Sequence, residues 1–515
     1  MRIGTNVAAI VANNALQKSQ NNLSTSIERL SSGYKINGSK DDAAGCAISE
    51  KMRAQIRGLS QAQNNTADGV SVLNTAEGAI TEIQSMLTRL KELSVQAAND
   101  VNSDDEREAI QKEIEQINNE IDRISDQTEF NTQSLINGNL SRRVYSDLQG
   151  VNQLSVCDSY TAGVYGITVT EDARQAIAIG AGSITMSSTA SITEEQAGAI
   201  NINGYKISIS EGDTLDKVMG KIIDGVNITG GSAFTVKDLN NDTAANGTDY
   251  AGYVPTADYA GSTLVIMTNQ YGSDQKMNIT CDNAELADIL GIPQAATQDG
   301  IYVEGSDVKA EIATGDDGKR IGFADSAILS TKGTVITVTD VNNKEFSMDV
   351  PGNAAGTVFD DSNNDGQSVA GAGTARTISQ EVTDVGTMSI HVGANQDQVI
   401  VIDIPAITTY SLGTEHMNVM TQYTASRAIS TVDEAINKTN KIRSRIGAYE
   451  NRFDHTTNNL EVSSENLTKS LSTMIDTDMS EEMTTYTSET VLTQAATSIL
   501  AQANERPSQV LQLLQ

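Results

Sequence analysis

Three histidines are the side chains in this sequence best suited to acid–base or metal chemistry near neutral pH. They are His391, His416 and His455, and the acidic residue Glu415 adjoins His416. No HExxH pair occurs, so the two imidazoles that a zinc metalloprotease places one helical turn apart are missing. A GxxxxGK[ST] phosphate loop and a GxSxG nucleophile elbow are also absent. The sequence therefore predicts no catalytic residue, no cofactor and no enzyme activity.

Acidic residues in the middle of the chain form one pattern similar to a calcium loop. Asp361-Ser362-Asn363-Asn364-Asp365-Gly366 matches the opening of such a loop, but its final position is Ala372, which lacks the bidentate carboxylate. Clusters of Asp, Asn and Gly usually only make turns. We therefore predict no metal site, and calcium binding near Asp361 stays an open alternative. Asp238, Asn240 and Asp242 form a weaker pattern of the same kind.

The three cysteines, Cys46, Cys157 and Cys281, lie far apart and form no CxxC pair. This spacing indicates neither a disulfide framework nor a zinc site. We expect all three to be small, partly buried side chains.

Charge and hydropathy exclude two classes of partner. The 515 residues carry a formal net charge of -32, whereas binding to nucleic acid needs clustered Lys and Arg. No apolar run reaches membrane-spanning length, so no membrane insertion is expected. Residues 1–16 also lack the pattern of a cleaved secretory signal peptide. The length predicts roughly two to four domains.

Glycine and proline divide the chain into three parts that differ in the structure they allow. Residues 1–130 hold 7 of the 40 glycines, residues 131–410 hold 31, and residues 411–515 hold 2. No proline precedes Pro255. Because these residues are the commonest helix breakers, both ends of the chain can form long helices.

Apolar residues at both ends repeat with the period of a coiled coil. The segment 99–106, rich in Asn, Asp and Ser, favours a turn between two helices of a hairpin. The C-terminal repeat predicts one long helix. The repeats are Leu16, Leu23 and Leu30 with Ile27; Leu59, Thr66, Leu73, Ile80 and Leu87 with Ile56 and Val70; Ile110, Ile114, Ile117, Ile121 and Ile124; and Val432, Ile436, Ile446, Phe453, Leu460, Leu467, Leu471 and Met474.

The extreme ends carry more apolar residues than the nearby sequence can cover. An ordinary internal bundle is the alternative interpretation of such repeats. The stripes lie at opposite ends of the chain, however, so each end is the natural partner of the other, and uncovered apolar helices indicate an assembly. The predicted interface consists of Ile3, Val7, Ile10, Leu16, Leu23, Leu30, Val491, Leu492, Ile499, Leu500, Val510, Leu511, Leu513 and Leu514.

The middle of the chain has the alternation and turn residues of β-strands. Residues 334–339 form a β-branched run that a turn connects to residues 347–350. A second hairpin is predicted from residues 390–392 and 399–404. These patterns predict compact β-rich bodies.

Motifs at both ends resemble the bacterial flagellins in order and spacing. They cover about 140 residues at the N-terminal end and about 130 at the C-terminal end. The segments are 3–6 (IGTN), 30–37 (LSSGYKIN), 40–45 (KDDAAG), 127–131 (QTEFN), 446–453 (IGAYENRF) and 510–514 (VLQLL).

The resemblance implies a multidomain α+β fold, in which long coiled-coil-like helices from both termini pack together and carry β-rich inserted outer domains. Residues 1–43 with 476–515 would be inner-tube terminal helices. Residues 44–143 with 384–475 would form an outer-tube helical domain, including a β-hairpin near 388–405. Residues 144–383 would be surface-exposed insertions, among them a module near 195–292 similar to one found in flagellins and hook-associated proteins.

The same resemblance implies a function and a route out of the cell. The chain would polymerise with itself into a motility filament outside the cell. It would leave unfolded through the flagellar type III system, without a cleaved signal, and meet an export chaperone, the cap and hook-associated proteins. The alternatives are a hook–filament junction protein and a secreted enzyme carried on flagellin-like termini.

A host partner is also implied, the innate Toll-like receptor that detects flagellin monomers. Residues 87–96 resemble the segment of the family that contacts the receptor, and Glu113 and Arg452 match its companions. Helical spacing would place Arg89, Leu93 and Gln96 on one face, while Leu87 and Leu90 serve the core. The predicted receptor-binding residues are Leu87, Arg89, Leu93, Gln96, Glu113 and Arg452. The alternative is that Arg89 and Glu113 only make contacts between subunits.

Overall fold

The computed structural model describes residues 6–156, 160–180, 182–237, 259, 261–292, 300–315, 318–340, 344–352, 359–360, 369–370, 375–383 and 385–513. The chain divides into two compact units. The first comprises Met1–Val70, Ile390–Ile400 and Asn451–Gln515, and the second comprises Ser71–Ser389 and Val401–Glu450. Two long helices, α2 (Ala43–Ala97) and α8 (Gln422–Ile475), contribute residues to both units.

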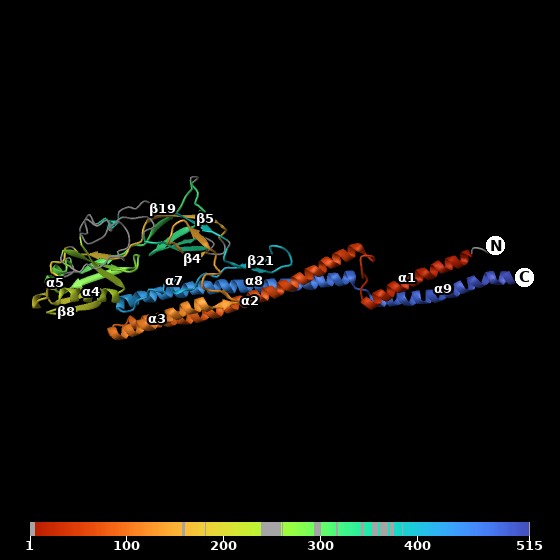
Figure 1. Ribbon diagram of the computed structural model, residues 1–515, viewed down its shortest axis with the longest axis horizontal. Coiled ribbons are helices and arrows are strands. Elements are labelled where there is room, and N and C mark those ends of the chain that lie inside the picture. The colour runs from red at the N-terminus through yellow and green to blue at the C-terminus, as the bar shows by residue number, and fades with distance from the viewer. Residues whose placement is uncertain are drawn as a thin grey trace. The chain divides into compact units, whose positions relative to one another are not determined.

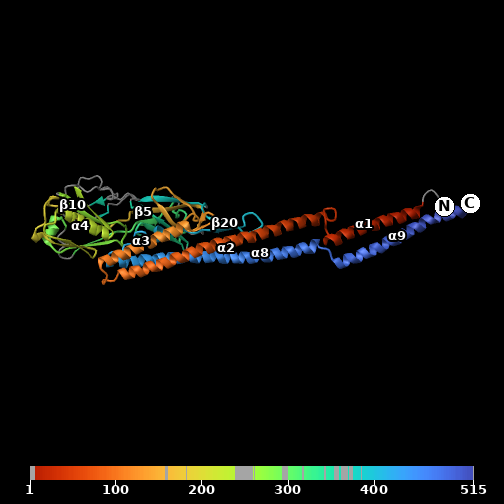
Figure 2. The same cartoon turned by 60° about the horizontal axis from the view of Figure 1, so that its bottom comes forward.

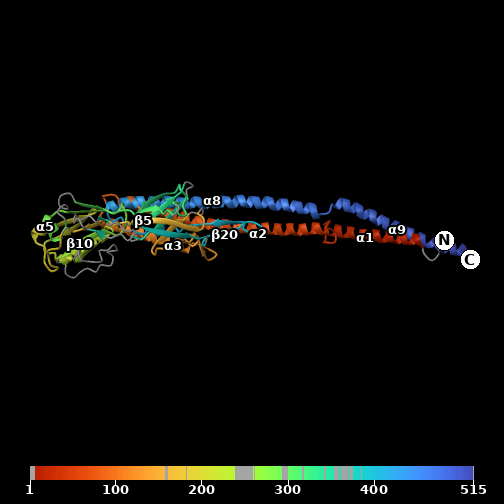
Figure 3. The ribbon, with the colours of Figure 1, turned by 90° about the horizontal axis from the view of Figure 1, so that it is seen from above.

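In the first unit, the two terminal helices α1 (Val7–Ser32) and α9 (Met479–Leu513) lie side by side, as all views show (Figure 1, Figure 2 and Figure 3). Asn6 caps α1 by accepting a 3.1 Å hydrogen bond from the amide of Ala9. Gly33 ends the helix in the left-handed conformation, at a φ of 76°, which glycine adopts without steric cost.

The interruption between α1 and α2 is tied to the interruption between α8 and α9. The amide of Lys35 donates to the carbonyl of Ile475 at 2.6 Å, and the amide of Thr477 donates to the carbonyl of Gly33 at 3.0 Å. Arg53 lies over the ring of Tyr34, 5.6 Å from its centroid. Both breaks therefore form one joint, held by backbone hydrogen bonds between segments far apart in sequence.

The helical part of the second unit is a packed bundle of α2, α3 (Asp104–Gln127) and α8. Ser103 and Glu106 form a reciprocal capping box at the start of α3, so the turn predicted over 99–106 is confirmed. Asp122 of α3 accepts hydrogen bonds from the amide and hydroxyl of Thr409, at 2.8 and 2.6 Å, where α7 (Thr409–Leu412) begins. The core of this part includes Leu73, Ile80, Ile83, Leu87, Leu90, Leu93, Ile114, Ile121, Val432, Ile446 and Tyr449.

One β-rich body has two antiparallel sheets around α4 (Leu215–Ile228), with η1 (Glu194–Gln196) and α5 (Ala284–Ile289) beside them. Its buried residues run from Ala176 to Val303, so the core also uses residues outside 195–292. The first sheet has the order β12 (Ile301–Glu304), β11 (Lys276–Cys281), β7 (Gly198–Ile202), β8 (Tyr205–Ile209); the second has β6 (Ile177–Ile179), β10 (Ser262–Thr268), β9 (Gly231–Lys237).

A second β-rich body has two four-stranded antiparallel sheets. Its core gathers Tyr160, Tyr165, Phe323 and Phe346, whose rings meet mostly edge to face. The sheets are β13 (Lys309–Ile312), β5 (Gly163–Glu171), β19 (Arg376–Val382), β3 (Val144–Ser146), and β14 (Ile328–Lys332), β15 (Val335–Thr339), β16 (Glu345–Asp349), β4 (Asn152–Val156).

Three short two-stranded pairs are also present in the described part of the chain: β1 (Glu129–Phe130) with β2 (Gln133–Ser134), β17 (Phe359–Asp360) with β18 (Val369–Ala370), and β20 (Met388–His391) with β21 (Val399–Ile402). Both predicted hairpins are confirmed, because β15 pairs with β16 and β20 pairs with β21. The predicted α+β fold with long terminal helices is likewise confirmed. The predicted domain boundaries stay predictions.

Candidate assembly interface

Polar contacts fix the antiparallel register of α1 against α9. Asn6 Nδ2 donates to the carbonyl of Ala503 at 2.8 Å near one end of the pair. Near the other end, Ser26 Oγ donates to Glu482 Oε1 at 2.5 Å, and Arg29 lies 3.7 Å from the same carboxylate. Ser26 is buried, whereas most large apolar side chains of the two helices are not. The pair is therefore aligned by polar groups more than by an apolar core.

The apolar residues predicted to form an interface remain largely uncovered on these helices. Val7 is 65% exposed, Ile10 50%, Val491 58%, Leu492 50% and Ile499 56%. Leu16, Leu23, Leu30 and Leu500 are partly buried. Such density of large apolar side chains in water is typical of a surface that binds another protein. Ile3, Leu514 and the side chains of Val510, Leu511 and Leu513 lie outside the described residues.

A shallow apolar groove lies on α9 within this surface. Thr484, Thr487, Ser488, Val491 and Leu492 line a space of about 480 Å³. All five lining residues belong to α9, so they form only one wall of the groove. A partner would have to supply the opposite wall.

The segment predicted to bind a receptor divides into buried and exposed residues. Arg89 is exposed, and its guanidinium lies 2.8 Å from Glu113 of α3 and 3.1 Å from Glu92. The hydrogen bonds that Arg89 donates to Glu113 and, second, to Glu92 raise the pKa of Arg89 above its usual value. Gln96 is exposed as well. These residues make a charged surface across α2 and α3.

Leu93 does not belong to that surface. It is 1% exposed, and Leu87 and Leu90 are fully buried. The expectation that Leu93 shares an exposed face with Arg89 and Gln96 is wrong, because the side of α2 that carries Leu93 packs into the bundle. Arg452 is exposed on α8, in the first unit, whereas the other five predicted residues belong to the second.

The residues considered for acid–base or metal chemistry lie apart from one another where the structure describes them. No cluster of three or more His, Cys, Asp or Glu in the described part of the chain is placed to hold a metal ion. The nearest acid to His416 is Glu415, 3.9 Å from Nε2, and the imidazole is exposed. The calcium-like patterns at 361–366 and 238–242, and Cys157, lie outside the described residues. Cys46 is partly buried and Cys281 is buried.

The described helices include none with both the length and the apolar character needed to cross a membrane.

Sequence reasoning missed the residues that lock the terminal pair, namely Asn6, Ser26, Arg29 and Glu482. These are isolated polar residues, and no local spacing predicts which distant side chain each one meets. The only available signal was that polar residues interrupt an apolar stripe, as Ser26 does between Leu23 and Ile27.

Comparison with known proteins identifies the family. Residues 3–141 match the model of the bacterial flagellin N-terminal helical region, and residues 429–514 match the model of the bacterial flagellin C-terminal helical region. The chain is 31% identical over 537 residues to flagellin of Salmonella typhimurium strain LT2, with 99% of each chain covered. It is 30% identical over 515 residues to polar flagellin A of Vibrio parahaemolyticus, with 100% of this chain and 99% of that relative covered.

Among solved structures, flagellar hook associated protein-3 from Legionella pneumophila aligns with 82% of this chain and 98% of its own length, at 13% identity and a TM-score of 0.28. That score is too low to support an argument. The relatives that match over the full length and the two family models that match the terminal regions identify the same family. The uncovered apolar side chains of the terminal helices are consistent with that family. The protein belongs to the bacterial flagellins, the structural subunits of the flagellar filament.

Proposed function

We propose that this subunit polymerises through α1 and α9, whose uncovered apolar side chains carry the proposal. One pair of helices leaves Val7, Val491 and Leu492 at least half exposed, and burying such side chains contributes about 1.5–3 kcal/mol each. Neighbouring copies supply that cover. Relatives that match the full length are named flagellins, which favours a filament subunit over a hook–filament junction protein.

Truncation tests the role of the ends. Deleting residues 1–38 or 476–515 is expected to leave a soluble, folded monomer that forms no filament. A point variant is sharper: Val491→Asp with Leu492→Asp introduces charge into the apolar groove and should abolish assembly. Thr497→Asp, at an exposed polar position of the same helix, is the matched control. Normal filaments from either truncation, or equal assembly of the two charged variants, would overturn the proposal.

The export route follows from the same family. The chain leaves the cell unfolded through the flagellar type III system, without a cleaved signal, assisted by an export chaperone, and folds at the growing end beneath the cap. An isolated helix pair with so little buried apolar area is marginally stable, so the terminal helices are disordered in free monomer. Amide exchange in monomer and in filament tests this step. Slow exchange over residues 7–32 in free monomer would contradict it.

We further propose that the innate Toll-like flagellin receptor binds the monomer around Arg89. The support is family resemblance together with the exposed cluster of Arg89, Glu113 and Gln96. Arg is favoured at the centre of interfaces, and its planar fork can exchange Glu113 for a receptor carboxylate. Leu87 and Leu93 then act by supporting the helix, because both are buried. Arg452, which lies in the first unit, is the remaining residue predicted to bind the receptor.

Receptor affinity of the monomer tests this second step. Arg89→Ala is expected to weaken binding to the receptor ectodomain at least about tenfold. Arg123→Ala is the matched control, since Arg123 of α3 is also an exposed arginine paired with a nearby acid, Glu120, at 2.5 Å. Equal affinities of the Arg89→Ala variant and the wild type would remove Arg89 from the site.

A further inference from the structure

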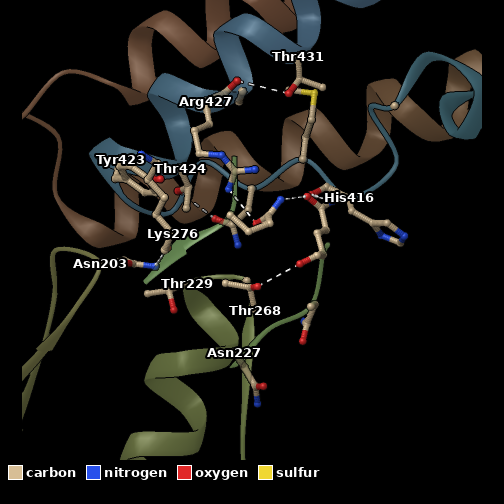
Figure 4. A pocket seen from close by; sticks show the side chains of 18 residues that line it. Asn203, Asn227, Thr229, Thr268, Lys276, His416, Tyr423, Thr424, Arg427 and Thr431 are labelled. Atoms are coloured by element: carbon tan, nitrogen blue, oxygen red, sulfur yellow. Dashed lines mark hydrogen bonds between the residues drawn. The ribbon is translucent and has the colours of Figure 1, made fainter. Parts of the chain in front are cut away.

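Two adjoining cavities lie between the first β-rich body and the start of α8, all within the second unit. The larger is about 460 Å³ and the smaller about 350 Å³, within the range of roughly 300–1,000 Å³ that is usual for ligand sites. Both are lined by Asn203, Lys276 and Tyr423, so they form one continuous cleft. Figure 4 shows Tyr423 and Arg427 reaching from α8 toward Lys276 and Asn203.

Tyrosines and amides dominate the chemistry of the cleft. Tyr205, Tyr302 and Tyr423 converge on the smaller cavity from β8, β12 and α8. Tyr302 is 51% exposed, and its hydroxyl donates to Glu304 Oε1 at 2.7 Å. Lys276 Nζ lies 5.6 Å from the centroid of the same ring. The ring of Tyr302 is therefore held in place while half of it faces solvent.

The larger cavity is lined by amide and hydroxyl side chains, several of them already aligned by neighbours. Arg427 donates to Gln275 Oε1 at 3.1 Å, and Gln275 Nε2 donates to Gln270 Oε1 at 3.0 Å. Asn203 Nδ2 donates to the carbonyl of Lys276 at 3.2 Å. This lining suits neither a lipid nor a drug-like apolar molecule, since sites for those are mostly apolar.

The charges in the cleft are nearly balanced. Lys276 pairs with Glu304 at 2.7 Å, and Arg107 lies 3.8 Å from Asp100 and 3.9 Å from Asp104. The chain as a whole carries a net charge of -32, which repels polyanions. At Lys276 and Arg107 an anionic ligand would thus have to displace existing acidic partners, and it would have to approach a strongly acidic protein.

We propose that this cleft binds an uncharged oligosaccharide. Sugars combine many hydroxyl donors and acceptors with weakly apolar ring faces, and tyrosine offers a flat apolar ring with a polar tip. Amides such as Asn203 and Gln275 can donate and accept at once. The residues that line the cleft lie outside α1 and α9, so the site adds a glycan-binding activity to the filament subunit without using the helices proposed to polymerise.

Saturation-transfer difference NMR on the full-length monomer tests the proposal. The probes are the uncharged oligosaccharides lacto-N-neotetraose, chitotetraose and maltotetraose, with 3′-sialyllactose and a heparin tetrasaccharide as charged comparisons. At least one uncharged probe is expected to bind. Tyr302→Ala and Tyr423→Ala should each weaken that binding at least about tenfold, and Tyr302→Phe, which keeps the ring, should retain most of it.

Tyr145→Ala is the control, because Tyr145 is similarly exposed at 56% but lies on β3, outside the lining of both cavities. Tyr302 lies on an edge strand, so its replacement should leave the fold intact even if Tyr423→Ala unfolds the chain; circular dichroism checks both. No binding of any uncharged probe, binding of the charged probes alone, or equal binding by the Tyr302→Ala and Tyr145→Ala variants overturns the proposal.

Discussion

The hydroxyl of Ser26 donates a 2.5 Å hydrogen bond to Oε1 of Glu482, although 456 residues separate the two. Arg29 lies 3.7 Å from the same carboxylate. The carboxylate of Glu482 thus interacts with two side chains of α1, those of Ser26 and Arg29. Most large apolar side chains of the two terminal helices are not buried. The two helices proposed to polymerise are therefore held in register at this carboxylate.

Replacing Glu482 by Ala is expected to destabilise the filament. The change leaves buried Ser26 without its acceptor, a loss of about 1–3 kcal/mol for a buried group. The measurement is the temperature at which filaments dissociate. Glu481→Ala is the control, because Glu481 is exposed on the same turn. Identical dissociation temperatures for the two variants would show that the contact does not align the pair.

Residues 144–383 are expected to be dispensable for assembly. Their two ends meet, since the amide of Arg143 donates to the carbonyl of Val385 at 2.9 Å and the amide of Thr383 donates to the carbonyl of Arg143 at 3.0 Å. A short Gly/Ser linker can therefore close the gap without strain. Electron microscopy of the excised variant should show filaments. Loss of polymerisation, with the helical part still folded, would contradict the predicted boundaries.

Ion pairs connect this insertion to the helices, and removing the insertion is expected not to expose a large apolar surface. Lys441 of α8 lies 3.0 Å from Glu345 of β16, and Lys332 of β14 pairs with Glu434 of α8. A variant that lacks both residues 144–383 and the terminal helices α1 and α9 is expected to remain soluble and monomeric. Light scattering measures this, and aggregation at low concentration would refute it.

Leu93→Ala is expected to lower the stability of the fold, whereas Arg89→Ala is expected to lower receptor affinity. Leu93 is buried, so truncating it should cost about 2–5 kcal/mol of unfolding free energy. Arg89 is exposed, so its replacement should leave the melting temperature nearly unchanged and weaken only receptor binding. Thermal unfolding and receptor affinity, measured on both variants, separate the two roles. A direct receptor role for Leu93 would require affinity loss with unchanged stability.

Acid is expected to destabilise the first β-rich body through Asp213. Hydrogen bonds from Lys217, Lys221 and the amide of Ser210 lower the pKa of this carboxyl far below its ordinary value of 3.8. The folded state therefore favours the carboxylate, and the resulting stability is present above about pH 3.8 and is lost as pH falls below it. Asp213→Asn should lower stability at neutral pH and flatten this dependence.

Unfolding of the full chain, followed by circular dichroism between pH 2 and 7, gives the measurement. Glu211→Gln is the control, because Glu211 is exposed close to Asp213. If Asp213→Asn keeps the acid dependence of the wild type, another carboxyl is responsible for it.

Much of the fold was predictable from local patterns in the sequence. Apolar steps of seven or of four and three, without proline, predicted α2, α3 and α8, because helix periodicity depends only on neighbours along the chain. The alternating β-branched run at 334–339 predicted β15 (Val335–Thr339) for the same reason. The motifs at both ends also indicated the family.

Spacing could not decide which side of a helix packs inward. Leu93 is compatible with either side of α2 by sequence, and only the position of α3 and α8 buries it. The same holds for Arg89, whose acidic partner Glu113 comes from another helix.

The sequence by itself determined that this protein has long helical ends, a β-rich middle and an excess of apolar residues at its termini. Only the tertiary structure decided that Ser26 meets Glu482, that Leu93 is buried, and that Tyr205, Tyr302 and Tyr423 share a cleft. The physical reason is that periodicity records the local geometry of the backbone, whereas contacts between side chains hundreds of residues apart depend on how whole elements pack.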